Sequence, residues 1–129
     1  MDLVPVELFA PTVLSLQAGG RVHSETPPRM SADADGWSVA MLNAETSKDV
    51  HGDRWEVHPA ADEALCVLSG SIRLILRGAD GASDAEHITL GTGTACIVPR
   101  GRWHRLELDG PAGLMSVTMH HGTRLEPRA

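Results

Sequence analysis

Short runs of hydrophobic residues, each about the length of a β-strand, are the main pattern of this chain. In residues 71–77, Ile72, Leu74 and Leu76 alternate with a face that carries two arginines, as in a strand with one buried face. Residues 64–69 are hydrophobic at nearly every position, which is typical of a strand buried on both faces. Similar patterns predict further strands at 37–44, 94–98, 103–108 and 114–119.

Glycine and proline separate these runs, and no segment shows a sustained helical period. Gly70 lies between the first two strands described, which predicts either a hairpin or a sharp bend there. Two polar stretches, 24–36 and 78–86, are predicted as loops that are too short to link separate domains. Many short strands are typical of a sandwich or barrel. We therefore predict one all-β, antiparallel domain over residues 1–129, with little or no helix and with N-terminal strands in residues 1–23.

Composition and charge argue against several classes of partner. The formal net charge is −6 and only 3% of the residues are aromatic. These values argue against nucleic acid or an anionic membrane as a partner, and they predict an aliphatic core. No hydrophobic run approaches the ~20 residues of a membrane span, and the N-terminal residues lack the positive charge of a secretory signal. Cys66 and Cys96 fit no metal-binding spacing, so we expect buried thiols, a reducing compartment and cytoplasmic localisation.

The candidate chemistry lies in Glu56-x-His58, in Glu63 and in His104. On a strand, Glu56 and His58 point the same way, and a turn after Pro59 would return Glu63 to the same space. Glu63 and His104 each share a strand face with aliphatic residues, where a carboxylate or an imidazole is costly to bury unless it is paired or binds a metal. Two histidines with one or two carboxylates are an ordinary ligand set for a divalent metal.

A second interpretation of the same residues needs no metal. By alternation, Trp55 and Val57 could be the buried residues of their strand. Glu56 and His58 would then face solvent. In that case His104 is a core histidine with its own hydrogen bonds, and Glu63 pairs with an arginine. Spacing alone leaves both interpretations open.

Two ordered motifs in this chain resemble those of the cupin superfamily. The resemblance is close over about residues 50–108 and extends loosely to both ends, including a C-terminal strand and tail at 112–129. It implies a double-stranded β-helix, or jelly-roll barrel, that holds a metal through histidines and a glutamate, and it favours a homodimer. The motifs that carry it are His58-x4-Glu63-x6-Gly70 and Gly93-x5-Pro99-x-Gly101-x2-His104.

Position 56 departs from the family pattern, which has its first histidine there, and Leu108 stands where the pattern often has asparagine. The resemblance implies Glu56, His58, Glu63 and His104 as ligands of iron, manganese, zinc or nickel. If Glu56 does not bind, the other three form the two-histidine, one-carboxylate set of non-haem iron oxygenases. Glu56 is then free to act as a catalytic general base.

Three arginines surround the last of these motif residues. Arg100, Arg102 and Arg105 are candidates for holding the carboxylate of a substrate, because a guanidinium pairs with a carboxylate through two parallel hydrogen bonds. The alternative is that these arginines are solvated charges at the rim of the barrel.

The remaining polar and aromatic residues of the motif region are predicted to have structural roles. Asp62 is expected in the turn before Glu63, and Trp55 and Trp103 are expected to pack rather than to stack on a substrate. The other histidines have no partner at a useful spacing, and we predict them to be surface or tail residues: His23, His51, His87, His120 and His121.

Three functions are consistent with these observations. The first is a cupin enzyme that binds a divalent metal and a small oxygenated or carboxylate-like substrate, as a dioxygenase, isomerase or lyase. The second is a metal-free barrel that binds a small molecule without catalysis, and the third is a structural dimer subunit. The sequence leaves open whether the protein is an enzyme.

Overall fold

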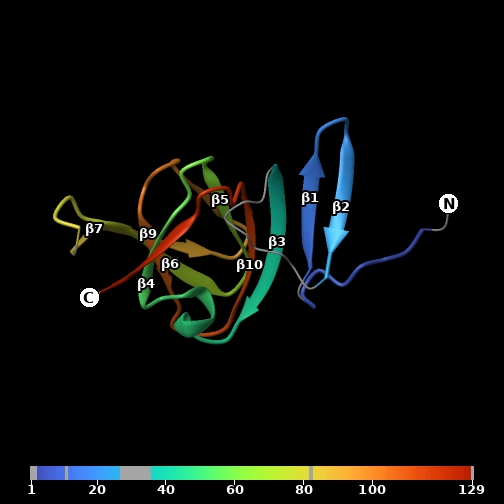
Figure 1. Cartoon of the computed structure of the whole chain (residues 1–129). Coiled ribbons are helices and arrows are strands. Elements are labelled where there is room, and N and C mark those ends of the chain that lie inside the picture. Colours follow the sequence, from blue (N-terminus) through green and yellow to red (C-terminus); the bar gives the residue numbers. More distant parts are fainter. Residues whose placement is uncertain (1–2, 11, 27–35, 82, 129) are drawn as a thin grey trace.

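Two antiparallel β-sheets face each other in the computed structural model, which describes residues 3–10, 12–26, 36–81 and 83–128. The six-stranded sheet has the order β2-β1-β3-β10-β5-β8, and the five-stranded sheet has the order β11-β4-β9-β6-β7. Figure 1 shows the β1–β2 hairpin beside β3, at the end of the molecule opposite β7. The prediction of an antiparallel, all-β fold is confirmed.

The elements are β1 (Val13–Gln17), β2 (Arg21–Glu25), β3 (Trp37–Ala44), the 3-10 helix η1 (Ser47–Val50), β4 (Arg54–Val57), β5 (Glu63–Ser69), β6 (Ser71–Arg77), β7 (Asp84–Gly91), β8 (Ala95–Val98), β9 (His104–Glu107), β10 (Ala112–Thr118) and β11 (Arg124–Pro127).

An aliphatic core fills the space between the sheets. Leu65 and Leu114 of the six-stranded sheet belong to the same buried cluster as Leu74 and Leu106 of the five-stranded sheet. Each comes from a strand on which alternate residues face inward, so the period-2 pattern of the sequence is the origin of this core. No aromatic residue belongs to the cluster, in line with the composition.

Gly70 makes a bend between the sheets, not a hairpin. β5 pairs with β10 and β8, whereas β6 pairs with β9 and β7 of the other sheet. Gly70 has φ of +77°, and a Cβ built on it would lie 2.5 Å from the carbonyl oxygen of Pro111. Only glycine combines that backbone conformation with so close a neighbour, because it has no Cβ.

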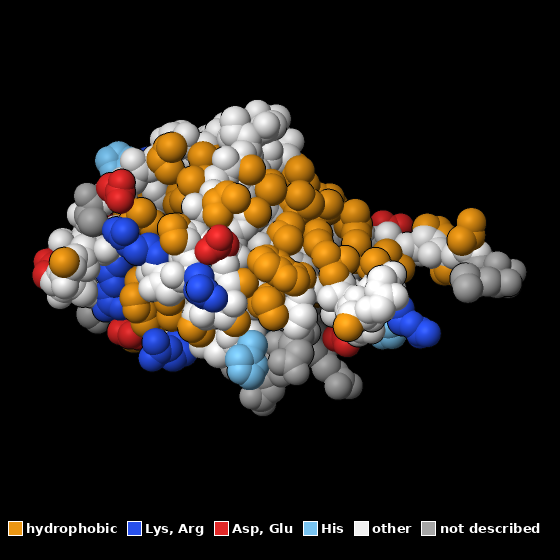
Figure 2. All heavy atoms as spheres, turned by 90° about the horizontal axis from the view of Figure 1, so that it is seen from above, with side chains coloured by type: hydrophobic (Ala, Val, Ile, Leu, Met, Phe, Trp, Pro, Cys, Tyr) orange, Lys and Arg blue, Asp and Glu red, His pale blue; other side chains and the backbone are white. Residues whose placement is uncertain are grey.

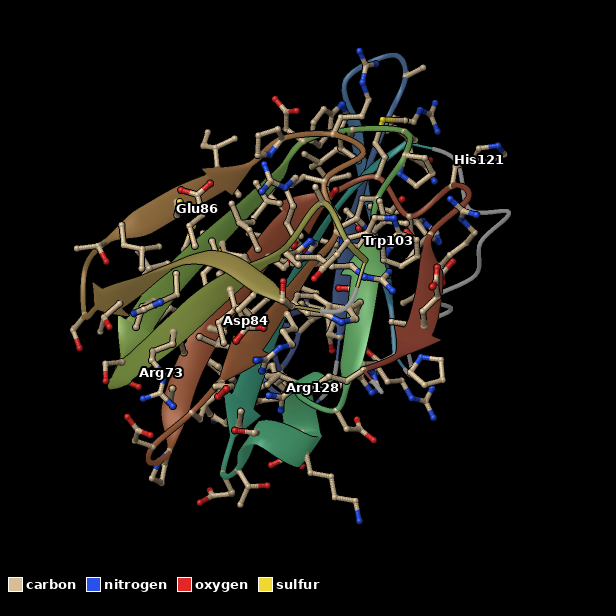
Figure 3. The ribbon with its side chains drawn as sticks, turned by 90° about the vertical axis from the view of Figure 1, so that its left-hand side faces the viewer. Arg73, Asp84, Glu86, Trp103, His121 and Arg128 are labelled. Atoms are coloured by element: carbon tan, nitrogen blue, oxygen red, sulfur yellow. The ribbon has the colours of Figure 1, made fainter. Side chains whose placement is uncertain are left out.

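The predicted loop 78–86 is wrong at its C-terminal end, because β7 begins at Asp84. Arg105 binds Asp84 at 3.0 Å and Arg102 lies 3.8 Å from Glu86, so the acidic residues of this strand are stabilised by arginines of other segments. Figure 3 shows Asp84 and Glu86 along this strand. The other predicted loop, 24–36, begins inside β2, and its residues 27–35 lie outside the described ranges.

The two cysteines are free and half-buried, whereas we expected both to be buried. Cys96 pairs with Leu65 across β5 and β8 and packs against the core, while Cys66 pairs with Ala95 on the other face of the sheet. The two thiols are therefore separated by the sheet, since they lie on its opposite faces. Among the described residues, no helix is long and apolar enough to cross a membrane.

Candidate metal centre

Four side chains from three strands and one turn converge inside the barrel. Glu56 on β4 pairs directly with His104 on β9, His58 follows β4, and Glu63 opens β5. Each offers one ligand atom, and these four atoms all lie within 4.8 Å of one another. The structure therefore brings together the four residues that the sequence singled out as metal ligands.

The distances within this cluster are those of ligands around one ion. His58 Nε2 lies 3.3 Å from Glu56 Oε1 and 3.3 Å from Glu63 Oε2. His104 Nε2 lies 3.0 Å from Glu63 Oε1 and 3.8 Å from Glu56 Oε1. Ligands about 2.1 Å from a common metal are about 3.0 Å apart at a right angle and about 3.4 Å apart at the tetrahedral angle. The donor set and its spacing thus fit a divalent metal.

Hydrogen bonds on the far side of each imidazole direct its Nε2 into the cluster. His58 Nδ1 is bonded to Thr123 Oγ1 at 2.8 Å, and His104 Nδ1–H donates to the carbonyl of Arg102 at 3.1 Å. Such outer contacts orient metal-binding histidines. The turn of the second motif also holds the first one, because the Gly101 N–H donates to the His58 carbonyl at 3.0 Å.

Asp62 strengthens this connection between the motif turns. Its carboxylate accepts the Arg100 N–H at 2.8 Å, and its carbonyl accepts the Thr118 hydroxyl at 3.0 Å. The structure thus places Asp62 in the turn, as predicted, and away from the cluster. Two turns that are about forty residues apart in sequence are therefore held in register around the four candidate ligands.

Burial leaves polar atoms of the cluster without hydrogen bonds. His58, Glu63 and His104 are almost inaccessible to solvent, whereas the side chain of Glu56 is 32% exposed. Ser116 donates to one oxygen of Glu63 at 2.7 Å, but Glu63 Oε1 and His58 Nε2 have no hydrogen bond of good geometry among the described residues. Buried polar atoms without partners are rare, and a metal ion at the centre of the cluster would give both of these atoms a partner.

The charges of the cluster are strongly coupled. Burial lowers the pKa of His58, but the two carboxylates of Glu56 and Glu63, each 3.3 Å from Nε2, outweigh it and raise the pKa to about 10. Burial raises the pKa of Glu63, but His104 and His58 outweigh it and hold that pKa well below its usual range. Without a metal, His58 is therefore an imidazolium at neutral pH, and its proton occupies the position that a metal would take.

Three members of the cluster line a cavity of about 570 Å³. These are Glu56, Glu63 and His104, so the cluster is open to a small molecule on one side. Much of the remaining wall is hydrophobic: Val13, Ala40, Met41, Leu42, Val50, Leu65, Leu106, Leu114 and Leu125.

Of the three predicted arginines, Arg105 is among the residues that line the cavity. Neither Arg100 nor Arg102 is among the cavity-lining residues. Arg105 is fully buried, and its guanidinium is held by Asp84 at 3.0 Å and by Glu107 at 2.9 Å. The alternative that Arg105 is a solvated charge at the rim is therefore wrong, because its guanidinium is buried and paired with two carboxylates within the protein.

The two tryptophans have the predicted packing roles. Trp55 is completely buried and lies next to the guanidinium groups of Arg77 and Arg105, at 5.7 and 5.2 Å from the ring centroid. Trp103 contacts Arg77 and Arg124 in the same way. Figure 3 labels Trp103 among the side chains on this side of the molecule. Trp55 thus faces outward from the strand whose other face carries the cluster.

Sequence reasoning missed His120 and Thr123. His120 lines the cavity, and its ring centroid is 5.4 Å from that of His58, so its prediction as a surface or tail residue is wrong. Burial, together with the charge of His58, lowers the pKa of His120. Both residues come from the turn that leads into β11, and no spacing in the sequence connects that turn with His58.

Comparisons with known proteins agree with this geometry. A family model described as a cupin domain matches residues 47–119. Solved structures with a similar fold include a cupin-2 domain protein of Shewanella frigidimarina, with a TM-score of 0.52 and 20% identity over 71% of this chain and 78% of that one. No curated protein matches significantly in sequence.

Two enzymes are also among the similar structures. A hydroquinone 1,2-dioxygenase of Sphingomonas has a TM-score of 0.52 and 18% identity over 66% of this chain and 60% of that one. An oxalate decarboxylase of Bacillus subtilis has a TM-score of 0.51 and 19% identity over 70% of this chain and 23% of that one. The match thus spans less than two thirds of each enzyme, and at these identities it shows the fold alone.

Proposed function

This chain belongs to the cupin family, and from that premise we propose that it binds one divalent metal ion and acts on a small oxygenated, carboxylate-bearing substrate. The observation that carries the proposal is the cluster of two imidazole nitrogens and two carboxylates within 4.8 Å, beside an open cavity. Oxygenase, isomerase and lyase chemistry all suit such a site. The oxygenase reaction is the first to test, because two histidines and one carboxylate leave coordination positions open.

The residues of the cluster would have two roles, which are binding the metal and binding or deprotonating the substrate. His58, Glu63 and His104 would hold the ion, which, when bound, acts as a Lewis acid or, as iron, activates dioxygen. Thr123 fixes the ring of His58 from outside the cluster. Glu56, the most exposed of the four, borders the cavity and is either a fourth ligand or the base that takes a proton from the substrate.

The alternative function is a metal-free barrel that binds a small molecule. It is supported by Glu56 at the position of a family histidine and by the charge balance of the cluster without metal. In that state the imidazolium of His58 lies between two carboxylates, which compensate its charge. Metal titration distinguishes the two functions.

We expect metal-free protein to take up about one ion per chain from at least one of Fe(II), Mn(II), Zn(II) and Ni(II). Because the pKa of His58 is about 10, uptake at pH 7–9 has to displace its proton. About one proton per ion should therefore be released, and the affinity should fall about tenfold for each unit by which the pH is lowered below 10. Calorimetric titration in two buffers of different ionisation enthalpy measures both quantities. Uptake of less than about a tenth of an ion per chain with all four metals would contradict the proposed function.

We also propose that the chain forms a homodimer through the outward face of the six-stranded sheet. The strand registers place only uncharged residues at the outward positions of β1, β3, β10, β5 and β8. Trp37, Leu68 and Ile97 on this face are 41%, 41% and 63% exposed. Figure 2 shows hydrophobic side chains gathered in a broad area over one face of the molecule.

The size and chemistry of this outward face fit a second copy of the chain. Five strands about 4.8 Å apart and on average about 6 residues long have a flat footprint of roughly 500 Å². Side-chain relief raises this area toward the ~800 Å² per partner of a standard interface. Because this face carries no charge, it does not favour a charged partner. It can pack against the same face of a second copy of the chain.

Sedimentation or light scattering at micromolar concentration should give twice the mass of one chain. Ile97→Lys and Val117→Lys place a charge on the outward face and should give a monomer, while leaving the circular dichroism spectrum unchanged. Thr89→Lys, on β7 of the other sheet, is the matched control and should remain a dimer. A wild-type monomer would contradict this association.

We further propose a cytoplasmic location. The free thiols of Cys66 and Cys96, which lie on opposite faces of one sheet, support a reducing compartment. Localisation of the tagged chain in its source cells tests this proposal.

A further inference from the structure

Arg54 is the first residue of β4 and lines the cavity that contains the cluster. It lies two residues before Glu56, so both side chains leave the strand on the same face, about 7 Å apart along it. Within the described part of the chain, its guanidinium makes no ion pair, side-chain hydrogen bond or ring contact. Arg54 is therefore an exposed residue of the cavity wall whose positive charge has no counter-ion among the described residues.

Outside the metal cluster, the other charged groups of the described cavity wall, Arg105 and Asp49, already have partners within the protein. Arg105 is the second arginine in the cavity wall, but Asp84 and Glu107 bind it. The carboxylate of Asp49 also borders the cavity, and it accepts the backbone N–H groups of Glu45 and Thr46 at 2.8 and 3.2 Å. Arg54 is thus the cation of the described cavity wall that has no internal partner, and an anion in the cavity would supply one.

A tight turn places His51 beside this arginine. The His51 carbonyl accepts the Arg54 N–H at 2.9 Å, and His51 also lines the cavity. His51 has φ of 54°, and it is the one non-glycine residue with positive φ among the described residues. A non-glycine residue in the left-handed region carries strain, which persists where the surrounding structure requires that conformation.

We propose that Arg54, with His51 as a second donor, forms a carboxylate-binding subsite of the cavity, separate from the metal cluster. The substrate class that fits is an oxo- or hydroxy-carboxylic acid, with its carboxylate on Arg54 and its other oxygen facing Glu56, Glu63 and His104. The hydrocarbon part between the two ends lies against the aliphatic wall. This inference rests on the proposed function for the second end of the substrate only, since the arginine recognises the carboxylate with or without a metal.

The test compares 4-oxopentanoate with 2-pentanone, which has a methyl group in place of the carboxylate. Calorimetry or ligand-observed NMR measures the affinity of both probes for the full chain, in metal-loaded and metal-free form. The wild-type protein should bind 4-oxopentanoate about tenfold or more tightly than 2-pentanone. Arg54→Leu should remove this preference and leave the affinity for 2-pentanone and the metal content unchanged. Arg54→Lys should be intermediate, because an ammonium group keeps the charge but lacks the two-pronged geometry.

Arg100→Leu is the matched control, because it makes the same change in charge on an exposed turn that does not line the cavity. It should bind both probes as the wild type does. The subsite is overturned if the wild type has no preference between the probes, if Arg54→Leu keeps the preference, or if Arg100→Leu loses it to the same extent. Failure of the proposed function is seen separately, as an absence of metal while the carboxylate preference persists in metal-free protein.

Discussion

Replacing His58 and His104 together by alanine is expected to abolish metal binding. These two residues provide both imidazole nitrogens of the cluster and leave only the carboxylates of Glu56 and Glu63. Structural zinc sites with four protein ligands bind with about 10–16 kcal/mol, so the loss of half of the ligands should weaken affinity by about a thousandfold or more. The metal content, measured by elemental analysis after reconstitution and desalting, should fall from about one ion per chain to less than about a tenth.

Two further variants make this result specific. His120→Ala removes a histidine that borders the same cavity but is not a member of the cluster, and it should keep its metal. Glu56→Gln should also keep its metal if Glu56 is the catalytic base, and should lose much of its affinity if Glu56 is a ligand. Metal retained by the double histidine variant would contradict the proposed site. Unchanged binding of a small molecule by that variant without metal would favour the metal-free barrel.

Trp55→Ala is expected to lower the free energy of unfolding by about 3–5 kcal/mol, the usual cost of truncating a buried aromatic side chain. Trp55 is completely buried, and its removal would open a cavity on the outward side of β4. It would also remove the ring that contacts the guanidinium groups of Arg77 and Arg105. Chemical denaturation of the metal-free protein, followed by circular dichroism, measures the change.

A graded variant tests the physical reason for this loss of stability. The indole nitrogen of Trp55 has no hydrogen-bond partner among the described residues, so Trp55→Phe gives up packing volume but no hydrogen bond seen there. It should cost clearly less than Trp55→Ala. A loss of less than about 1 kcal/mol in the alanine variant would show that the surrounding loops close over the space or that the region is already loose.

Strand prediction succeeded where hydrophobic periodicity was strong. The intervals 37–44 and 71–77 coincide with β3 and β6, and 64–69 lies within β5. It failed at β7, where Asp84 and Glu86 suggested a loop, because their arginine partners come from β9 and the turn before it. Local polarity cannot indicate a strand whose charges are neutralised by residues about twenty positions away.

The candidate site was predicted in its members but not in its surroundings. Glu56, His58, Glu63 and His104 could be named because turn residues and strand parity bring such positions together, and because two spaced motifs resemble those of a known family. The sequence did not indicate that Arg105 is buried and paired with Asp84, which lies about twenty residues away in the chain. Arg54 and His120 were not recognised, because neither has a motif spacing to the cluster.

The sequence by itself therefore determined the class of fold, the aliphatic core and the four residues of the cluster. The fold class and the core depend on period-2 patterning and on turns, which act over a few residues, whereas the full set of four cluster residues followed from two motifs that resemble those of the cupin superfamily. Only the tertiary structure decided which sheet each strand joins at Gly70, which arginines are neutralised and which one remains free in the cavity. Those outcomes depend on pairing between residues far apart in the chain, and charge compensation is settled by whichever groups the folded backbone brings within a few ångströms.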